Sequence, residues 1–275
     1  MSAASSRPVR VSLFGATGRM GQNLIRAIHD STDFELVGAL ASADSAALGT
    51  DAGAAGGLAA RLGVSVTHDA RAALVGAEVA LDFSTAGAVG GHLDACLAAG
   101  VGFVVGTTGF DDYTDRRLAA AAAEIAVLIA PNTSLGVNLL AQLVERAAAS
   151  LPAEYDIEIL EAHHRYKVDA PSGTALKLGR AAAAGRGIDP GDLPGTAGSA
   201  PSGPRQAGSI GYAVVRGGDI VGEHTVLYAG PGERLELTHR AHDRMTFAYG
   251  ALRAAAWLRG RPAGLYTMGD VLGLR

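Results

Sequence analysis

The 275-residue chain has one cysteine, few aromatic residues and no excess of positive charge. Because the single cysteine, Cys96, cannot form a disulfide within the chain, we expect a reducing compartment and therefore a cytoplasmic protein. The formal net charge is -4. Proteins that bind nucleic acid or anionic membranes usually concentrate lysine and arginine, so this balance predicts neither as a partner.

Long apolar runs are also missing. Glycine and charged residues interrupt every run before it reaches the roughly 18 to 20 residues that cross a bilayer. Residues 1–8 lack the apolar region that a secretory signal requires. The sequence therefore predicts a soluble protein without a membrane partner.

The chain does contain enough apolar residues, 48%, for one large domain or two modest ones, and we favour two. Between Arg10 and Ala130, short apolar runs alternate with alanine-rich helical stretches, which is typical of a parallel sheet covered on both faces. The expected strands are Val11–Phe14, Leu36–Leu40, Val79–Phe83, Gly102–Val105 and Ala126–Ile129. The expected helices between them include Met20–His29, Val89–Ala98 and Tyr113–Ala123.

The pattern changes near Asn132, where a second domain is expected to begin. There we expect helices at Leu135–Ser150 and Thr174–Ala184, a strand at Tyr155–Glu161 and a loop at Gly185–Gly208. Three further strands, joined as an antiparallel meander, are expected at Ile210–Arg216, Glu223–Ala229 and Arg234–His239. A last helix, Met245–Leu258, would return to the first domain. The predicted domains are thus residues 1–131 with 242–275, and residues 132–241.

Three glycines, Gly15, Gly18 and Gly21, lie where the first strand meets the first helix. Glycines there allow a tight turn and close approach of a pyrophosphate to the helix start, so the motif predicts a dinucleotide site. The alternative is a turn with a purely structural role. No acidic residue ends the second strand at Ala41–Ser42, so discrimination between NADH and NADPH should be weak. Arg19 would favour NADPH modestly.

Four basic side chains lie within five positions: His163, His164, Arg165 and Lys167. Pro171–Thr174 then opens a helix, whose free N–H groups bind anions. Cations beside a helix start predict a carboxylate or phosphate substrate, and histidine supplies acid or base chemistry near neutral pH.

A structural interpretation of the same segment stays open. Asp169 and Ser172 would then be turn and cap residues, and for Asp169 we favour that role. A zinc site explains the segment less well, because adjacent histidines in a strand point to opposite faces and no cysteine pair accompanies them. We therefore expect no metal. His224, His239 and His242 are expected to be structural or surface residues.

The stretches Gly15–Gly21, Asp82–Ser84, Gly106–Gly109, Ala130–Asn138, Glu161–Leu176 and Gly218–Thr225 resemble the 4-hydroxy-tetrahydrodipicolinate reductase (dihydrodipicolinate reductase) family over nearly the whole chain. The resemblance implies an α/β fold, in which a Rossmann-like dinucleotide domain precedes an α+β substrate domain with an open mixed sheet. It also implies NADH or NADPH as cofactor, a small dicarboxylate as substrate and a homotetramer.

The same resemblance implies roles for individual residues. His163 would be the acid/base residue, Lys167 a cationic proton donor, and His164, Gly173 and Thr174 would bind the substrate carboxylates. The dinucleotide would contact Gly15, Ala16, Thr17, Gly18, Arg19, Met20, Gly106, Thr107, Thr108, Ala130, Pro131, Asn132 and Thr133. This chain departs from the family at Ala41–Ser42, where an acidic residue is common, and at Thr133, where a bulkier side chain is common.

Two other functions remain to be weighed. A two-domain dehydrogenase that works through a covalent thiol would need a positioned cysteine, whereas Cys96 lies in an apolar helical pattern. A non-catalytic dinucleotide sensor would keep the glycine turn but would not need the basic cluster.

Overall fold

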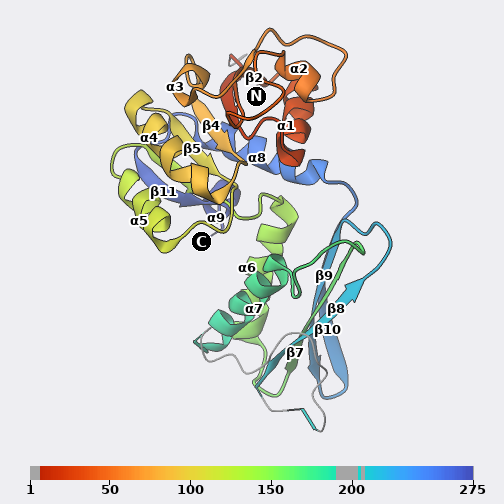
Figure 1. The fold of residues 1–275 in the computed structure, drawn as a ribbon. Helices are drawn as coiled ribbons and strands as arrows, with labels where there is room; N and C mark the ends of the chain where they lie inside the picture. Colours follow the sequence, from red (N-terminus) through yellow and green to blue (C-terminus); the bar gives the residue numbers. More distant parts are fainter. Residues whose placement is uncertain (1–6, 190–203, 206–207, 275) are drawn as a thin grey trace, which may run out of the picture. The chain divides into compact units, whose positions relative to one another are not determined.

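The structure is a computed structural model that describes residues 7–189, 204–205 and 208–274. The chain forms two compact units (Figure 1). The first unit consists of the described residues up to Leu135 together with Met245–Gly273, and the second of Gly136–Arg244. Within the described ranges, no helix is long and apolar enough to span a membrane.

The first unit is built on a seven-stranded sheet in which every strand pair is parallel. The order across the sheet is β11 (Gly264–Thr267), β6 (Ala126–Ile129), β5 (Gly102–Val105), β4 (Val79–Asp82), β1 (Val9–Phe14), β2 (Phe34–Leu40) and β3 (Val66–Thr67). The central strands are buried on both faces, which explains their continuous apolar runs. The predicted Rossmann-like parallel sheet is confirmed.

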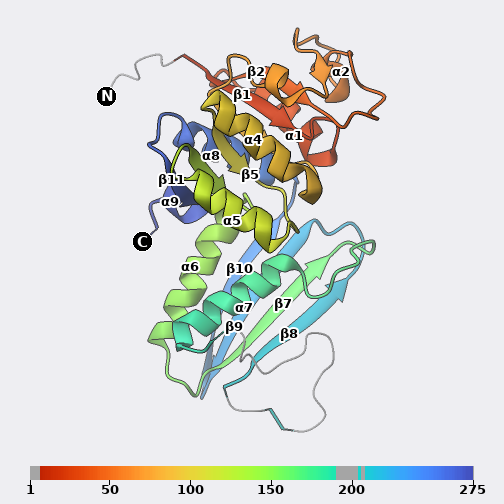
Figure 2. The same ribbon diagram turned by 60° about the vertical axis from the view of Figure 1, so that its left-hand side comes forward.

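Two apolar clusters, one on each face, hold this sheet between its helices (Figure 2). On one face lie α1 (Arg19–His29), α2 (Ala52–Ala55), α8 (Met245–Leu258) and α9 (Met268–Leu272); on the other lie α3 (Ala70–Ala73), α4 (Val89–Ala99) and α5 (Asp112–Ala121). Cys96 is fully buried in the second cluster, as its apolar surroundings predicted. The short elements β3, β11, α2, α3 and α9 were not predicted, because two to five residues give too little periodicity.

The second unit contains a four-stranded mixed sheet in the order β10 (Glu233–Ala241), β9 (Gly222–Gly230), β7 (Asp156–His163) and β8 (Ile210–Arg216). Its helices α6 (Leu135–Ser150) and α7 (Gly173–Arg186) share one apolar core with the sheet. The predicted open mixed sheet is confirmed. Most of the predicted loop Gly185–Gly208 lies outside the described residues, while α7 extends two residues into it.

The predicted antiparallel meander of the last three strands is right for β9 and β10 and wrong for β8. β9 and β10 are an antiparallel pair, but β7 lies between β9 and β8 and pairs in parallel with β8. Parallel strands need a crossover, and α7 supplies it between β7 and β8. β9 therefore pairs with the other edge of β7.

Alternation along β7 determines what faces the core of this unit. Ile157, Ile159, Glu161 and His163 are buried, whereas Leu160 between them is exposed. A carboxylate and an imidazole thus extend an apolar stripe toward the end of the strand. Both groups need polar partners there, because burial of an unpaired charge is strongly unfavourable.

Candidate functional site

The backbone of the glycine turn in the first unit explains why glycines occupy positions 15 and 21. Gly15 has a φ of +81°, and a Cβ atom on it would lie 2.4 Å from the Phe83 carbonyl oxygen. A Cβ on Gly21 would lie 2.2 Å from the Gly15 carbonyl oxygen. Gly18 is the N-cap of α1, and no side chain caps the helix. The turn therefore presents the start of α1 to an anion, which is the arrangement expected for a dinucleotide pyrophosphate.

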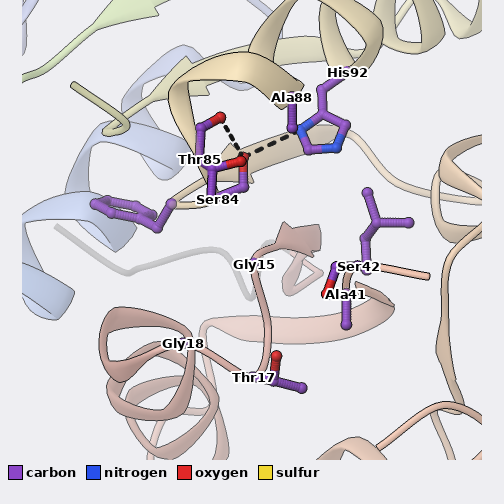
Figure 3. A pocket seen from close by; sticks show the side chains of 11 residues that line it. Gly15, Thr17, Gly18, Ala41, Ser42, Ser84, Thr85, Ala88 and His92 are labelled. Carbon is purple, nitrogen blue, oxygen red and sulfur yellow. Dashed lines mark hydrogen bonds between the residues drawn. The ribbon is translucent and has the colours of Figure 1, made fainter. Parts of the chain in front are cut away.

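A cavity of about 240 Å³ lies at this turn, at the carboxyl ends of β1, β2 and β4 (Figure 3). In an open parallel sheet this is where ligands bind. The cavity is lined by Gly15, Thr17, Gly18, Leu40, Ala41, Ser42, Phe83, Ser84, Thr85, Ala88 and His92. Of the predicted dinucleotide residues, Gly15, Thr17 and Gly18 line it, whereas Ala16 is buried beside them and Arg19 is exposed.

A buried carboxylate that we did not predict organises one wall of this cavity. Asp82, at the end of β4, is fully buried. Its Oδ2 lies 2.7 Å from His92 Nδ1, and its Oδ1 accepts hydrogen bonds from the hydroxyls of Ser84 at 2.6 Å and Thr107 at 2.7 Å. Burial alone would raise the pKa of Asp82, but the bonds from His92, Ser84 and Thr107 outweigh it and lower the pKa. Thr107, predicted to contact the dinucleotide, is thus hydrogen-bonded to the carboxylate that organises the cavity wall.

The segment Ala130–Thr133 is fixed to α8 within the same unit. Thr133 is buried, and its hydroxyl donates to the Phe247 carbonyl oxygen at 2.7 Å. A Cβ on Gly250 would lie 1.8 Å from the Thr133 carbonyl oxygen, so α8 packs directly on this turn. The small Thr133 side chain therefore has a packing role, because it bonds to the helix.

An acidic residue that we did not associate with the cavity lies near Ser42. The Ser42 hydroxyl hydrogen-bonds the Asp44 carboxylate and lowers the pKa of Asp44. Because Ser42 lines the cavity two residues after the end of β2, Asp44 brings a negative charge near the position where dinucleotide folds recognise the adenosine ribose. Its place two residues beyond Ser42 was visible in the sequence, but its bond to Ser42 was not.

In the second unit, the buried stripe of β7 ends in a carboxylate–histidine pair. Glu161 Oε2 lies 2.5 Å from His163 Nδ1. Two guanidinium nitrogens of Arg216, from β8, donate to the two Glu161 oxygens at 2.8 Å each, and the Ser172 backbone N–H adds a bond of 3.0 Å. Burial acts to raise the pKa of Glu161, but Arg216 and His163 outweigh it and lower the pKa. Glu161 is therefore a fixed, ionised hydrogen-bond acceptor.

His224, expected to be structural or exposed, is buried beside this pair. Its ring centroid lies 5.1 Å from that of His163, and its Nε2 lies 3.0 Å from the Ser172 hydroxyl. Burial lowers the pKa of His224 to about 4 and also lowers the pKa of His163. Both imidazoles are thus neutral at neutral pH. The alternation of side chains along β9 could have indicated that His224 is buried. It could not have indicated that His224 lies beside His163.

The other predicted substrate residues lie between the end of β7 and the first turn of α7. Ser172 caps α7 by accepting the Ala175 N–H at 3.1 Å. A Cβ on Gly173 would meet no atom within 4 Å, so the helix start is open. Lys167 Nζ donates hydrogen bonds to both carboxylate oxygens of Asp169, at 2.8 and 2.9 Å. Asp169, predicted to be a turn residue, is therefore also the ion-pair partner of Lys167. His164 Nδ1 is buried without a hydrogen-bond partner among the described residues.

Two alternative chemistries find no support in this arrangement. Burial raises the pKa of the Cys96 thiol, which is the opposite of what a nucleophilic cysteine needs. Across the ranges that the structure describes, no group of three or more histidine, cysteine, aspartate or glutamate side chains could hold a metal ion.

Comparisons with known proteins agree with each other. Residues 9–133 match the family description "Dihydrodipicolinate reductase, N-terminus" and residues 136–272 match "Dihydrodipicolinate reductase, C-terminus". The chain is 54% identical to a 4-hydroxy-tetrahydrodipicolinate reductase of Thiobacillus denitrificans, over 97% of this chain and 99% of the relative. It is 51% identical to the protein of that name from Alkalilimnicola ehrlichii, over 96% and 99%.

Solved structures show the same similarity. The dipicolinate-bound dihydrodipicolinate reductase of Paenisporosarcina sp. TG-14 superposes with a TM-score of 0.76 at 28% identity, covering 94% of this chain and 97% of that one. An amine dehydrogenase of Mycobacterium smegmatis shares the fold alone, with a TM-score of 0.63 at 16% identity over 94% and 95%.

Proposed function

Since the chain belongs to the dihydrodipicolinate reductase family, we infer that it reduces 4-hydroxy-tetrahydrodipicolinate to tetrahydrodipicolinate with a nicotinamide dinucleotide, in lysine and diaminopimelate biosynthesis. Water is released in the reaction. The observation that carries the proposal is the Glu161–His163 pair beside Lys167 and the open start of α7. A pure dinucleotide sensor has no use for a buried acid/base pair next to an anion site.

The substrate is a dicarboxylate, and the second unit supplies groups that suit it. The helix start at Gly173 and Thr174, together with His164, would hold the carboxylates. Lys167 would add a positive charge and a proton donor. His163 would act as the acid/base residue: its Nδ1 is occupied by Glu161, which leaves Nε2 to deliver a proton.

The dinucleotide, when bound, supplies the hydride. With the hydroxyl group lost as water and the hydride on the ring, His163 would protonate the enamine-like carbon. The turn Gly15–Met20 would hold the pyrophosphate, while Gly106–Thr108 and Ala130–Thr133 would lie near the nicotinamide. On this proposal the first unit is the dinucleotide domain, with residues 242–275 belonging to it, and residues 132–241 form the substrate domain.

We also propose a cytoplasmic homotetramer assembled through the mixed sheet of the second unit. Among the described residues, the shared apolar core of α6, α7 and the sheet lies on one face. Leu160 of β7 and Val215 of β8 are 42% and 54% exposed, away from that core. Association of these faces would bury both side chains.

A coupled assay tests the proposed activity. Purified protein with freshly generated hydroxytetrahydrodipicolinate should oxidise NADH or NADPH in a substrate-dependent manner, followed as loss of absorbance at the nicotinamide band. A folded protein that binds NADH or NADPH but oxidises neither would support the dinucleotide-sensor hypothesis and contradict the proposed reductase activity. Omission of the substrate is the control.

Cofactor preference should be small, because the charges near the ribose oppose each other. Arg19 would attract a 2′-phosphate and Asp44 would repel it, and an exposed ion pair changes affinity by less than about tenfold. We expect kcat/KM for the two cofactors to agree within about tenfold. Asp44→Asn should move the ratio toward NADPH by a few fold.

The matched control for Asp44→Asn is Asp30→Asn, which removes a charge at the far end of α1. It should leave the ratio unchanged, and added salt should shrink the Asp44 effect. A native preference of a hundredfold, or no change in Asp44→Asn, would show that other residues recognise the ribose.

A further inference from the structure

The Glu161–His163 pair is surrounded by charged and ionisable side chains, of which Arg216 and His224 have no role in the reaction proposed above. His163 faces Glu161 on its own strand, Arg216 on β8, His224 on β9 and Lys167 in the loop after β7. His239, on β10, contributes to the lowered pKa of His224. The Asp169 carboxylate pairs with Lys167, so Glu161 is the carboxylate that bonds His163, opposite the permanent charge of Arg216.

Arg216 controls how Glu161 can act. Its two guanidinium nitrogens bond both carboxylate oxygens, and one of them also donates to the Asp169 carbonyl oxygen at 2.8 Å. A planar fork of this kind fixes the plane of the carboxylate as well as its charge. Glu161 Oε2 is therefore held 2.5 Å from His163 Nδ1 and fixes the tautomer of the imidazole.

The other ring nitrogen of His163 lies against a glycine. A Cβ on Gly222 would come within 3.1 Å of His163 Nε2, so the absence of a side chain there leaves room at this atom. Nδ1 bonds the carboxylate, and Nε2 is the atom left for the substrate. Burial and the nearby Lys167 and Arg216 lower the pKa of His163, which keeps the ring neutral before an anion arrives.

Resting on the function proposed above, we propose that Glu161 and Arg216 are positioning residues that couple proton uptake to substrate binding. A dicarboxylate brings negative charge to Lys167, His164 and the start of α7. This charge offsets Lys167 and Arg216, which add to the effect of burial in keeping His163 neutral. His163 Nε2 then takes a proton from solvent, and Glu161 stabilises the imidazolium through Nδ1. The acid needed for protonation of the substrate forms only when the substrate is bound.

Proton uptake can be measured directly with the wild-type protein. Dipicolinate, a dicarboxylate, is titrated into the protein with its dinucleotide by calorimetry near pH 7.5, in buffers of different ionisation enthalpy. We expect uptake of roughly half a proton or more per site. His163→Gln should bind dipicolinate without this uptake. Binding without proton uptake in the wild type would overturn the proposal, while absence of turnover in the coupled assay would overturn the function beneath it.

The positioning role is tested by the pH dependence of kcat. Glu161 raises the pKa of His163, so Glu161→Gln lowers it and moves the alkaline fall of kcat to lower pH by about one unit or more. A purely structural role would lower kcat at every pH without moving that limb. Arg216→Lys keeps the charge but loses the fork, so it should lower kcat several fold with the limb in place. An unmoved limb in folded Glu161→Gln contradicts the proposal.

Discussion

His163→Gln should lower kcat by about 10² to 10⁴-fold while leaving dinucleotide affinity nearly unchanged. Glutamine can still donate a hydrogen bond to Glu161, so the buried carboxylate keeps a partner and the fold is preserved. It cannot transfer a proton, and the general acid is lost. The measurement is steady-state kcat together with the dinucleotide Kd, which reports on the first unit independently.

Two observations would contradict this role. A kcat within about threefold of the wild type would remove His163 from the chemistry, because a general acid is worth far more. Equal losses in kcat and in dinucleotide affinity would point to damage of the whole protein. His68→Gln, a histidine in the first unit outside the lining of the cavity, is the control for the substitution itself and should retain full activity.

Gly21→Ala should weaken dinucleotide binding by roughly 10- to 150-fold, the loss of one charge-assisted hydrogen bond at about 1.5 to 3 kcal/mol. A methyl group on Gly21 would lie 2.2 Å from the Gly15 carbonyl oxygen and 2.5 Å from that of Ala16. Backbone atoms cannot rotate away as side chains can, so α1 must move from the phosphate turn. The displacement should also lower the free energy of unfolding by about 1 to 3 kcal/mol.

Gly91→Ala is the matched control, because Gly91 also lies in a helix of the first unit and a Cβ there would meet no atom within 4 Å. Alanine at such a site should stabilise the helix by up to about 1 kcal/mol without changing dinucleotide affinity. Fluorescence titration with reduced dinucleotide gives Kd, and urea denaturation gives stability. Wild-type affinity in Gly21→Ala would mean that the close approach of α1 to the turn is not needed for binding.

The parallel sheet of the first unit could be predicted because its signal is local. Strands that are buried on both faces, such as β4, appear in the sequence as continuous apolar runs. The three glycines from Gly15 to Gly21 lie together at one strand–helix junction. The order of strands in the second unit could not be predicted in this way. Periodicity shows which face of β9 is buried, but it does not show that β9 pairs with β7. That pairing arises because α7 carries the chain from β7 to β8 on the other edge of β7.

In the candidate sites too, features contiguous in the sequence could be predicted, whereas contacts between distant residues could not. The sequence by itself determined the contiguous features: the glycine turn and the run from His163 to Lys167 before a helix start. Only the tertiary structure paired Glu161 with Arg216, 55 residues away, placed His224 beside His163, and joined Asp82 to His92 and Thr107. The physical reason is that a buried charge must find a partner, and that partner can come from any part of the chain that folding brings within hydrogen-bond distance.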